Sequence, residues 1–309
     1  MPLDAELLLE WGEPALDEIC LKAYAKINLT LDVVGKRQDG YHLLQSVMQS
    51  IDLCDLVSLR KAPQGISLAV NDPAVPADAQ NTAWRAAELF LNRMEIRAGA
   101  AIAIEKQIPA AAGLGGGSAD AAAVLVGLDR LYGTGLSPTA LQEMALSVGA
   151  DVPFCIQGGT QFAEGIGEQL TELPPVPNAA FVLVKPRAGM ATQRVYQMLE
   201  PSVFGTQYSQ EFIRQLVKGE NWQALARTMG NVLESVTAKL VPEVGIWERR
   251  LLESGVLGTV MSGSGPTVVG IFSTADQARH FHDRWQGQAM IVLSHPVERG
   301  VGQSNGGDR

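Results

Sequence analysis

The chain has 309 residues, of which 46% are apolar and 18% are charged, and its formal net charge is −9. This composition is typical of a globular protein with one large domain or two moderate ones. The acidic balance argues against a general nucleic-acid binder, which normally presents a basic face. It also means that local positive groups must meet any phosphate-bearing ligand.

Cysteine usage and hydropathy narrow the class further. Cys20, Cys54 and Cys155 are far apart and lack CxxC spacing, so they indicate neither a disulfide framework nor a zinc site. No apolar run approaches the ~20 residues that span a bilayer, and the acidic residues 1–17 lack the basic start of a signal peptide. We therefore expect a cytoplasmic protein with no membrane partner.

The first half of the chain mixes strand and helix patterns. Alternating apolar residues predict strands, one of them long or divided in two, at residues 19–34, 46–60, 66–70 and 101–105. Helical spacing and N-terminal signals predict helices at residues 81–93, 118–131 and 138–149. Strands and helices are interleaved without a βα repeat, which favours an α+β fold over a doubly wound sheet.

A proline-rich segment at residues 174–177 is the clearest linker. It predicts an N-terminal domain over residues 18–173 and a C-terminal domain over 174–299, with tails at 1–17 and 300–309. Beyond it, strands are expected at residues 181–185, 259–261, 267–272 and 289–293. Helical patterning covers residues 191–254, including 221–231 and 245–254, and then 275–286. The polar, glycine-rich tail is expected to be disordered.

Four glycines within five residues mark the most informative segment, PAAAGLGGGS at residues 109–118. Glycine allows a positive φ and a close approach of the backbone to a ligand, and the helix that follows offers free amides to an anion. No Lys-Ser or Lys-Thr pair follows, so this is not a P-loop, and the acidic residue of a dinucleotide fingerprint is missing. The alternative is a flexible turn before a helix.

Four further patterns each allow a functional and a plain structural interpretation. Lys26 and Asn28 leave the same strand face and suit an anion, or they lie on a solvated face. Tyr41 and His42 follow a tight turn and suit a planar base, or they pack in a hairpin. Asp151 is a base for an attacking hydroxyl or, more simply, a helix N-cap. The turn SGSGP at residues 262–266 completes a phosphate cradle or merely joins two strands.

Together, and in this order, these segments resemble the superfamily of galactokinase, homoserine kinase, mevalonate kinase and phosphomevalonate kinase. Residues 25–29 and 35–42, with GADVPF at 149–154 and SGSGPT at 262–267, resemble one branch in particular. That branch phosphorylates the 2-hydroxyl of a cytidyl diphosphate sugar alcohol in the non-mevalonate isoprenoid pathway. The resemblance spans residues 20–293 and implies a β-rich α+β N-terminal domain and a ferredoxin-like C-terminal domain, with the active site in the cleft between them.

The resemblance also implies residue roles. Asp151 corresponds to the catalytic carboxylate and Lys26 to its charged partner; Asn28 would hold the substrate, and Tyr41, His42 and Tyr196 would bind the cytosine. Mg2+ is expected as a cofactor with Ser118 as its contact. Asp120 stands where some relatives have Asn. ATP would lie on Pro109, Ala110, Ala111, Ala112, Gly113, Leu114, Gly115, Gly116, Gly117, Ser118 and Ala119.

Two alternatives remain open at this point. A homoserine or mevalonate type of kinase would share the glycine loop, but its substrate would not use the Tyr41–His42 pair. A non-catalytic nucleotide- or RNA-binding protein would share the strand and helix elements, but the acidic charge and the presence of both Lys26 and Asp151 disfavour it.

Overall fold

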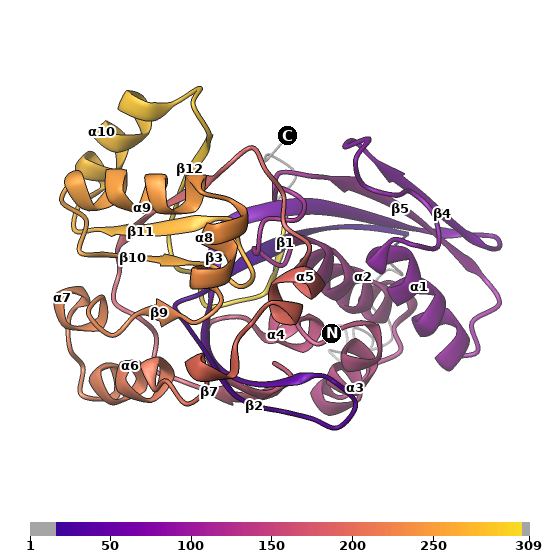
Figure 1. The fold of residues 1–309 in the computed structure, drawn as a ribbon. Coiled ribbons are helices and arrows are strands. Elements are labelled where there is room, and N and C mark those ends of the chain that lie inside the picture. Colours follow the sequence, from indigo (N-terminus) through magenta and orange to yellow (C-terminus); the bar gives the residue numbers. More distant parts are fainter. Residues whose placement is uncertain (1–16, 305–309) are drawn as a thin grey trace, which may run out of the picture.

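A computed structural model describes residues 17–304 of the chain, which form two sheets flanked by helices (Figure 1). The longest strands belong to the larger sheet. In it, β1 pairs in antiparallel fashion with β13 on one side and with β3 on the other. Its strands are β1 (Glu18–Asn28), β2 (Thr30–Lys36), β3 (His42–Ala62), β4 (Ile66–Val70), β5 (Gly99–Glu105), β6 (Thr160–Gly165), β7 (Gln169–Glu172), β9 (Gly230–Asn231) and β13 (Val301–Gln303).

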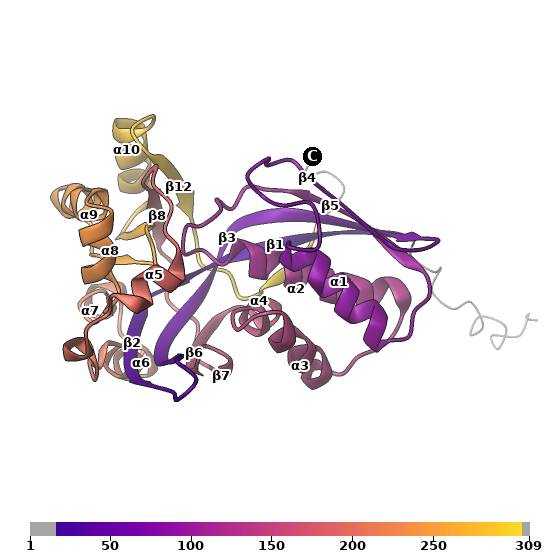
Figure 2. The ribbon, with the colours of Figure 1, turned by 45° about the vertical axis from the view of Figure 1, so that its right-hand side comes forward.

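Helices cover one face of this sheet (Figure 2). Their apolar sides, dominated in the second helix by alanine, valine and leucine, pack against β1 and β3 and form the main core. The approach is close, because a Cβ on Gly127 would lie 2.1 Å from Cδ1 of Leu59. These helices are α1 (Thr82–Arg93), α2 (Gly116–Tyr132), α3 (Pro138–Val148) and α4 (Val152–Gln157).

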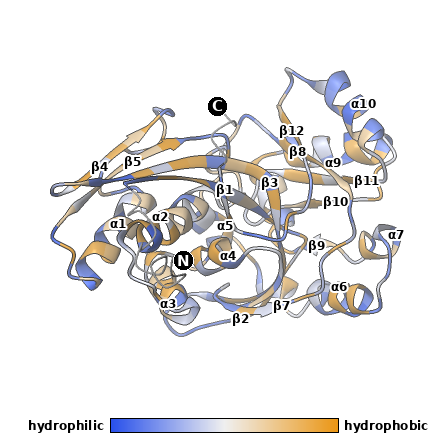
Figure 3. Cartoon of the chain, turned by 180° about the vertical axis from the view of Figure 1, so that it is seen from behind, coloured by the Kyte–Doolittle hydropathy of each residue, from blue (hydrophilic) through white to orange (hydrophobic). Residues whose placement is uncertain are grey.

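The second sheet has the strand order β12-β8-β11-β10, all antiparallel. In chain order this is 4-1-3-2, and helices connect the first strand to the second and the third to the fourth, which is the ferredoxin-like βαββαβ arrangement. In Figure 3, α10 is largely hydrophilic because it buries only Ala278 and Phe281. The elements are β8 (Ala180–Lys185), α8 (Glu234–Leu240), α9 (Glu243–Glu253), β10 (Gly258–Met261), β11 (Val268–Phe272), α10 (Ala275–Trp285) and β12 (Met290–Ser294).

Short helices between β8 and α8 link the two sheets. They are α5 (Thr192–Gln197), a 3-10 turn (Pro201–Val203), α6 (Tyr208–Val217) and α7 (Trp222–Leu225). The buried carboxylate of Asp32 on β2 accepts hydrogen bonds from the amides of Tyr208 (3.1 Å) and Ser209 (2.8 Å) and from the Thr206 hydroxyl (2.5 Å). Asp32 therefore satisfies the first amides of α6 from a distant strand.

The α+β interpretation is confirmed by this arrangement, but two local predictions are wrong. Only Trp222–Leu225 of the helix expected at 221–231 is helical, because Gly230–Asn231 pair in parallel with β2. Within the tail expected to be disordered, Val301–Gln303 form β13 on the edge of β1. Residues 1–16 and 305–309 of the predicted tails lie outside the described residues. The division at residue 174 stays a prediction.

Asp32→Ala should lower the free energy of unfolding by about 1–3 kcal/mol, because three donors, among them the buried amide of Ser209, would lose a charged acceptor. Urea unfolding followed by circular dichroism measures this. As a control, Asp276→Ala removes a carboxylate that is 89% exposed on α10 and pairs only with exposed Arg279. It should change stability little. Equal stability of the two variants would contradict the capping role of Asp32.

Candidate active site

A cleft of about 1040 Å3 opens between the glycine loop, the end of β1, the β2–β3 turn and α5. The predicted residues Lys26, Asn28, Tyr41, His42, Asp151 and Tyr196 all line it, as do residues 109–118. Ala119 does not line the cleft, because it is fully buried in the first turn of α2. The fold therefore brings together segments from both halves of the chain.

Lys26 and Asn28 lie side by side on β1, as their spacing predicts. Lys26 is 5% exposed, and its ammonium donates to Oδ1 of Asn28 at 2.7 Å and lies 3.5 Å from Oδ2 of Asp151. The side-chain amide of Asn28 in turn donates to Oγ of Ser46 at 2.7 Å. This chain of contacts fixes the ammonium in front of the Asp151 carboxylate, and the interpretation as a solvated strand face is wrong.

The carboxylate of Asp151 is available to the cleft. Asp151 precedes α4 with an α-helical backbone (φ −82°, ψ −12°), and its side chain makes no capping hydrogen bond. An N-cap residue normally has an extended backbone and accepts from the first turn. The N-cap interpretation is therefore wrong, and the carboxylate faces Lys26, with about a third of the side chain exposed.

The glycine loop presents backbone to the cleft. Gly113 and Gly115 have φ of +78° and +71°, which disfavours any residue with a Cβ. A Cβ on Gly115 would lie 2.9 Å from Cγ of Lys26. Gly115 is the N-cap of α2 and has no side chain to cap it, so the positive end of a 17-residue helix opens toward the ligand space.

The turn at residues 262–266 closes the cleft from the other half of the chain. Oγ of Ser262 donates to the carbonyl of Gly113 at 2.8 Å and accepts from the backbone amide of Asn28 at 3.2 Å. Gly263 and Ser264 line the cleft. The segment is thus a tight turn and also a wall of the cleft.

Aromatic rings gather at the far end of the cleft. His42 stacks on Tyr196 with ring centroids 5.2 Å apart, and Phe204 meets His42 edge-on at 6.0 Å. Burial, and then nearby Lys36, lower the pKa of His42, so its imidazole is neutral at neutral pH. Tyr41 is 61% exposed at the rim. A base stacked between His42 and Tyr196 would require their ring centroids to lie about 7 Å apart, which is more than the 5.2 Å between them. The exposed ring of Tyr41 therefore offers the free face on which a base could stack.

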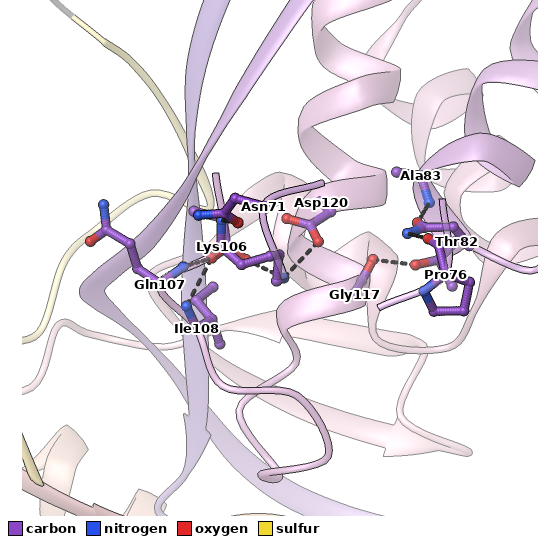
Figure 4. Close-up of polar contacts among 11 residues, drawn as sticks. Asn71, Pro76, Thr82, Ala83, Lys106, Gln107, Ile108, Gly117 and Asp120 are labelled. Carbon is purple, nitrogen blue, oxygen red and sulfur yellow. Dashed lines mark hydrogen bonds and ion pairs between the residues drawn. The ribbon is translucent and has the colours of Figure 1, made fainter. Parts of the chain in front are cut away.

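Sequence reasoning missed a group of charged residues beside the loop (Figure 4). Lys106 follows β5, and its ammonium contacts Oδ2 of Asp55 at 2.5 Å and Oδ2 of Asp120 at 2.7 Å. Burial, only partly offset by Lys106, raises the pKa of Asp120 to about 7. The signal available was an acidic residue, Asp55, between Cys54 and Leu56 inside a predicted strand.

Within residues 17–304, no helix is long and apolar enough to cross a membrane, and no group of three or more His, Cys, Asp or Glu side chains is placed to hold a metal ion. Ser118, in the first turn of α2, lines the cleft together with Asp151. A hydroxyl and a carboxylate are the oxygen ligands that Mg2+ accepts alongside substrate phosphates.

Known proteins match the chain over most of its length. The models of the GHMP kinases N-terminal and C-terminal domains match residues 81–159 and 212–290. A solved homoserine kinase from Cytophaga hutchinsonii shares the fold with a TM-score of 0.77 and 21% identity, over 94% of this chain and 99% of that one.

Two relatives that are more similar in sequence are both named as one kinase. The 4-diphosphocytidyl-2-C-methyl-D-erythritol kinase of Acetivibrio thermocellus is 46% identical over 85% of this chain and 93% of its own length. A solved 4-(cytidine 5'-diphospho)-2C-methyl-D-erythritol kinase superposes with a TM-score of 0.76 and 33% identity, over 90% of this chain and 99% of that one. The chain belongs to the 4-diphosphocytidyl-2-C-methyl-D-erythritol kinase family of GHMP kinases and is a small-molecule kinase.

Proposed function

We propose that this kinase transfers the γ-phosphoryl group of ATP to the 2-hydroxyl of 4-diphosphocytidyl-2-C-methyl-D-erythritol. The observation that carries the proposal is the Lys26–Asp151 pair, held at 3.5 Å in a cleft that has a glycine loop beside it. Phosphoryl transfer needs in-line positioning and charge stabilisation more than covalent chemistry. The cleft supplies a base, a cation and a helix N-terminus for this purpose.

The residues around the loop fit ATP and Mg2+. The lack of a Cβ lets Gly113 pack on the backbone of Ser262 and Gly115 on the Lys26 side chain, and the uncapped N-terminus of α2 opens beside them. ATP would lie on residues 109–118, with the backbone of the loop as the main donor to its phosphates. Bound Mg2+, with Ser118 as its protein contact, would neutralise charge on the β- and γ-phosphates.

Asp151 would act as the general base. Its carboxylate would accept the proton of the substrate 2-hydroxyl as the oxygen forms its bond to the γ-phosphorus and ADP leaves. The Lys26 ammonium would orient the carboxylate and stabilise negative charge on the transferring group. Asn28 would keep Lys26 in place through the 2.7 Å hydrogen bond and hold the substrate near the reacting hydroxyl.

The aromatic end would recognise the cytosine. Tyr41, whose ring is free at the rim, would stack on the base. Neutral His42 has one ring donor and one acceptor, which suits the edge of a cytosine. Tyr196 would back His42 and limit the depth of the pocket. Homoserine and mevalonate have no base for these rings, which disfavours them as substrates.

A coupled assay for ADP release tests the proposed reaction. We expect release with the cytidyl substrate and none above background with homoserine or mevalonate. Release on homoserine without release on the cytidyl substrate would reverse the choice of substrate. No release on any of the three would favour a binding protein over an enzyme.

Asp151→Asn should lower kcat about 10²- to 10⁴-fold, because the amide cannot accept the hydroxyl proton. ATP affinity, measured by calorimetry, should stay within a few-fold of the parent because Asp151 lies outside the glycine loop. Asp39→Asn, which removes an exposed carboxylate at the cleft rim, serves as the matched control. Normal turnover of Asp151→Asn would remove it from the role of base.

Tyr41→Ala should raise KM for the cytidyl substrate about 5- to 150-fold, which corresponds to the loss of one base–aromatic stack of about 1–3 kcal/mol. KM for ATP should not change. Tyr41→Phe keeps the ring and should behave like the parent. In a thermal-shift assay, CDP should stabilise the parent more than UDP does. An unchanged KM in Tyr41→Ala would show that the base stacks elsewhere.

A further inference from the structure

A buried ion cluster, made of Asp55 on β3, Lys106 after β5 and Asp120 on α2, lies beside the glycine loop. Asp55 and Asp120 are almost completely inaccessible, at 0% and 2% exposure. The side chain of Lys106 is 7% exposed, and Lys106 and Asp120 both line the cleft. None of the three has a part in the transfer step proposed above.

The ion cluster joins the two ends of the loop. Before the loop, Oδ1 of Asp55 accepts from the amides of Gln107 at 2.6 Å and Ile108 at 2.8 Å, and Pro109 follows directly. After the loop, Asp120 lies in the first turns of α2. Lys106 bonds to both carboxylates, so one ammonium connects the entry of the loop, its exit and the sheet below (Figure 4).

The charges explain why the carboxylates are needed there. A Cβ on Gly116 would lie 3.3 Å from Nζ of Lys106, so the ammonium sits at the first residue of α2. The N-terminus of a helix is its positive end and repels a cation. Without anionic partners, the long flexible side chain of Lys106 would turn toward solvent. The two carboxylates hold it against this repulsion.

A gain in stability alone would not explain this ion cluster, because burying charged groups costs free energy. Two carboxylates and one ammonium are withdrawn from water, and Oδ1 of Asp120 is a buried oxygen with no hydrogen-bond partner in the described part of the chain. Buried ion pairs are often no more stabilising than apolar residues of similar size, whereas their geometry is specific. The cluster is therefore better explained by the position that it imposes on the loop.

We propose that Asp55 and Asp120 are positioning residues for the nucleotide: they hold Lys106 at the start of α2 and thereby set the spacing between the two ends of the glycine loop. This proposal rests on the proposed binding of ATP to that loop. Neither carboxylate contacts the phosphates, whose charge they would repel. They act through the Lys106 ammonium and through the backbone of residues 107–108.

Asp120→Ala tests the proposal through steady-state kinetics with both substrates. Loss of a charged hydrogen bond to Lys106 should raise KM for ATP about ten- to hundredfold. The kcat at saturating ATP should stay within about threefold, and KM for the cytidyl substrate should not change. Asp120→Asn keeps an oxygen acceptor of the same shape for Lys106 but removes the charge, so its KM for ATP should lie between those of the parent and Asp120→Ala.

Asp32→Asn is the matched control for burial, because it alters another fully buried carboxylate, on β2, away from the loop. It should lower the melting temperature and leave KM for ATP unchanged. If Asp120→Ala does not fold, Lys106→Gln replaces the cation by a neutral donor and should also raise KM for ATP. An unchanged KM for ATP in Asp120→Ala, or in Lys106→Gln where that variant is used, overturns the proposal.

Calorimetric titration of the parent protein with MgATP separates this result from a failure of the proposed function. If the parent binds MgATP and Asp120→Ala binds it equally well, the positioning role is wrong and the kinase mechanism stands. If the parent itself does not bind MgATP, the assignment of the glycine loop is wrong. Equal increases in the KM of both substrates would indicate a general structural role and would also overturn the proposal.

Discussion

The active cleft depends on a junction where three distant segments, β1, the glycine loop and the turn at residues 262–266, meet. The amide of Lys26 donates to the carbonyl of Leu114 at 3.0 Å, and the carbonyl of Gly113 accepts from Ser262 at 2.8 Å. Only a glycine fits at position 113, because a Cβ there would lie 2.1 Å from the carbonyl oxygen of Ser262. Since the first contact joins two backbone atoms and the second is made to a backbone carbonyl, the strand that carries Lys26 and the start of α2 keep a fixed separation.

Fixed local charge matters in this chain because its overall charge works against a phosphate ligand. With a net charge of −9, the average field repels a polyanion, but salt screens exposed charges beyond about 8–10 Å. Within that distance of the cleft lie Lys26, Lys106 and the positive end of α2, together with the carboxylates of Asp151, Asp55 and Asp120 that pair with the two lysines. The near groups therefore outweigh the distant ones, provided that they are held in place.

The sequence predicts features whose causes are local. Strand alternation places Lys26 and Asn28 on one face of β1. Ser137, which directly precedes α3, caps that helix through its own hydroxyl. It does not predict features that depend on a distant partner. The three residues of β13 become a strand only because the edge of β1 is free to pair with them. Asp151 reads as an N-cap until the fold places Lys26 beside it.

The same distinction explains why shared architecture does not decide the substrate. A homoserine kinase has the same fold, so the sheets, the helices and the phosphate loop are compatible with more than one acceptor. The aromatic end of the cleft is built from the β2–β3 turn and a short helix, which carry Tyr41, His42 and Tyr196. Neither element carries the main core, so its side chains can change without loss of the fold. The aromatic end of the cleft can therefore vary independently of the glycine loop and of the Lys26–Asp151 pair, which the main sheet and its helices hold in place.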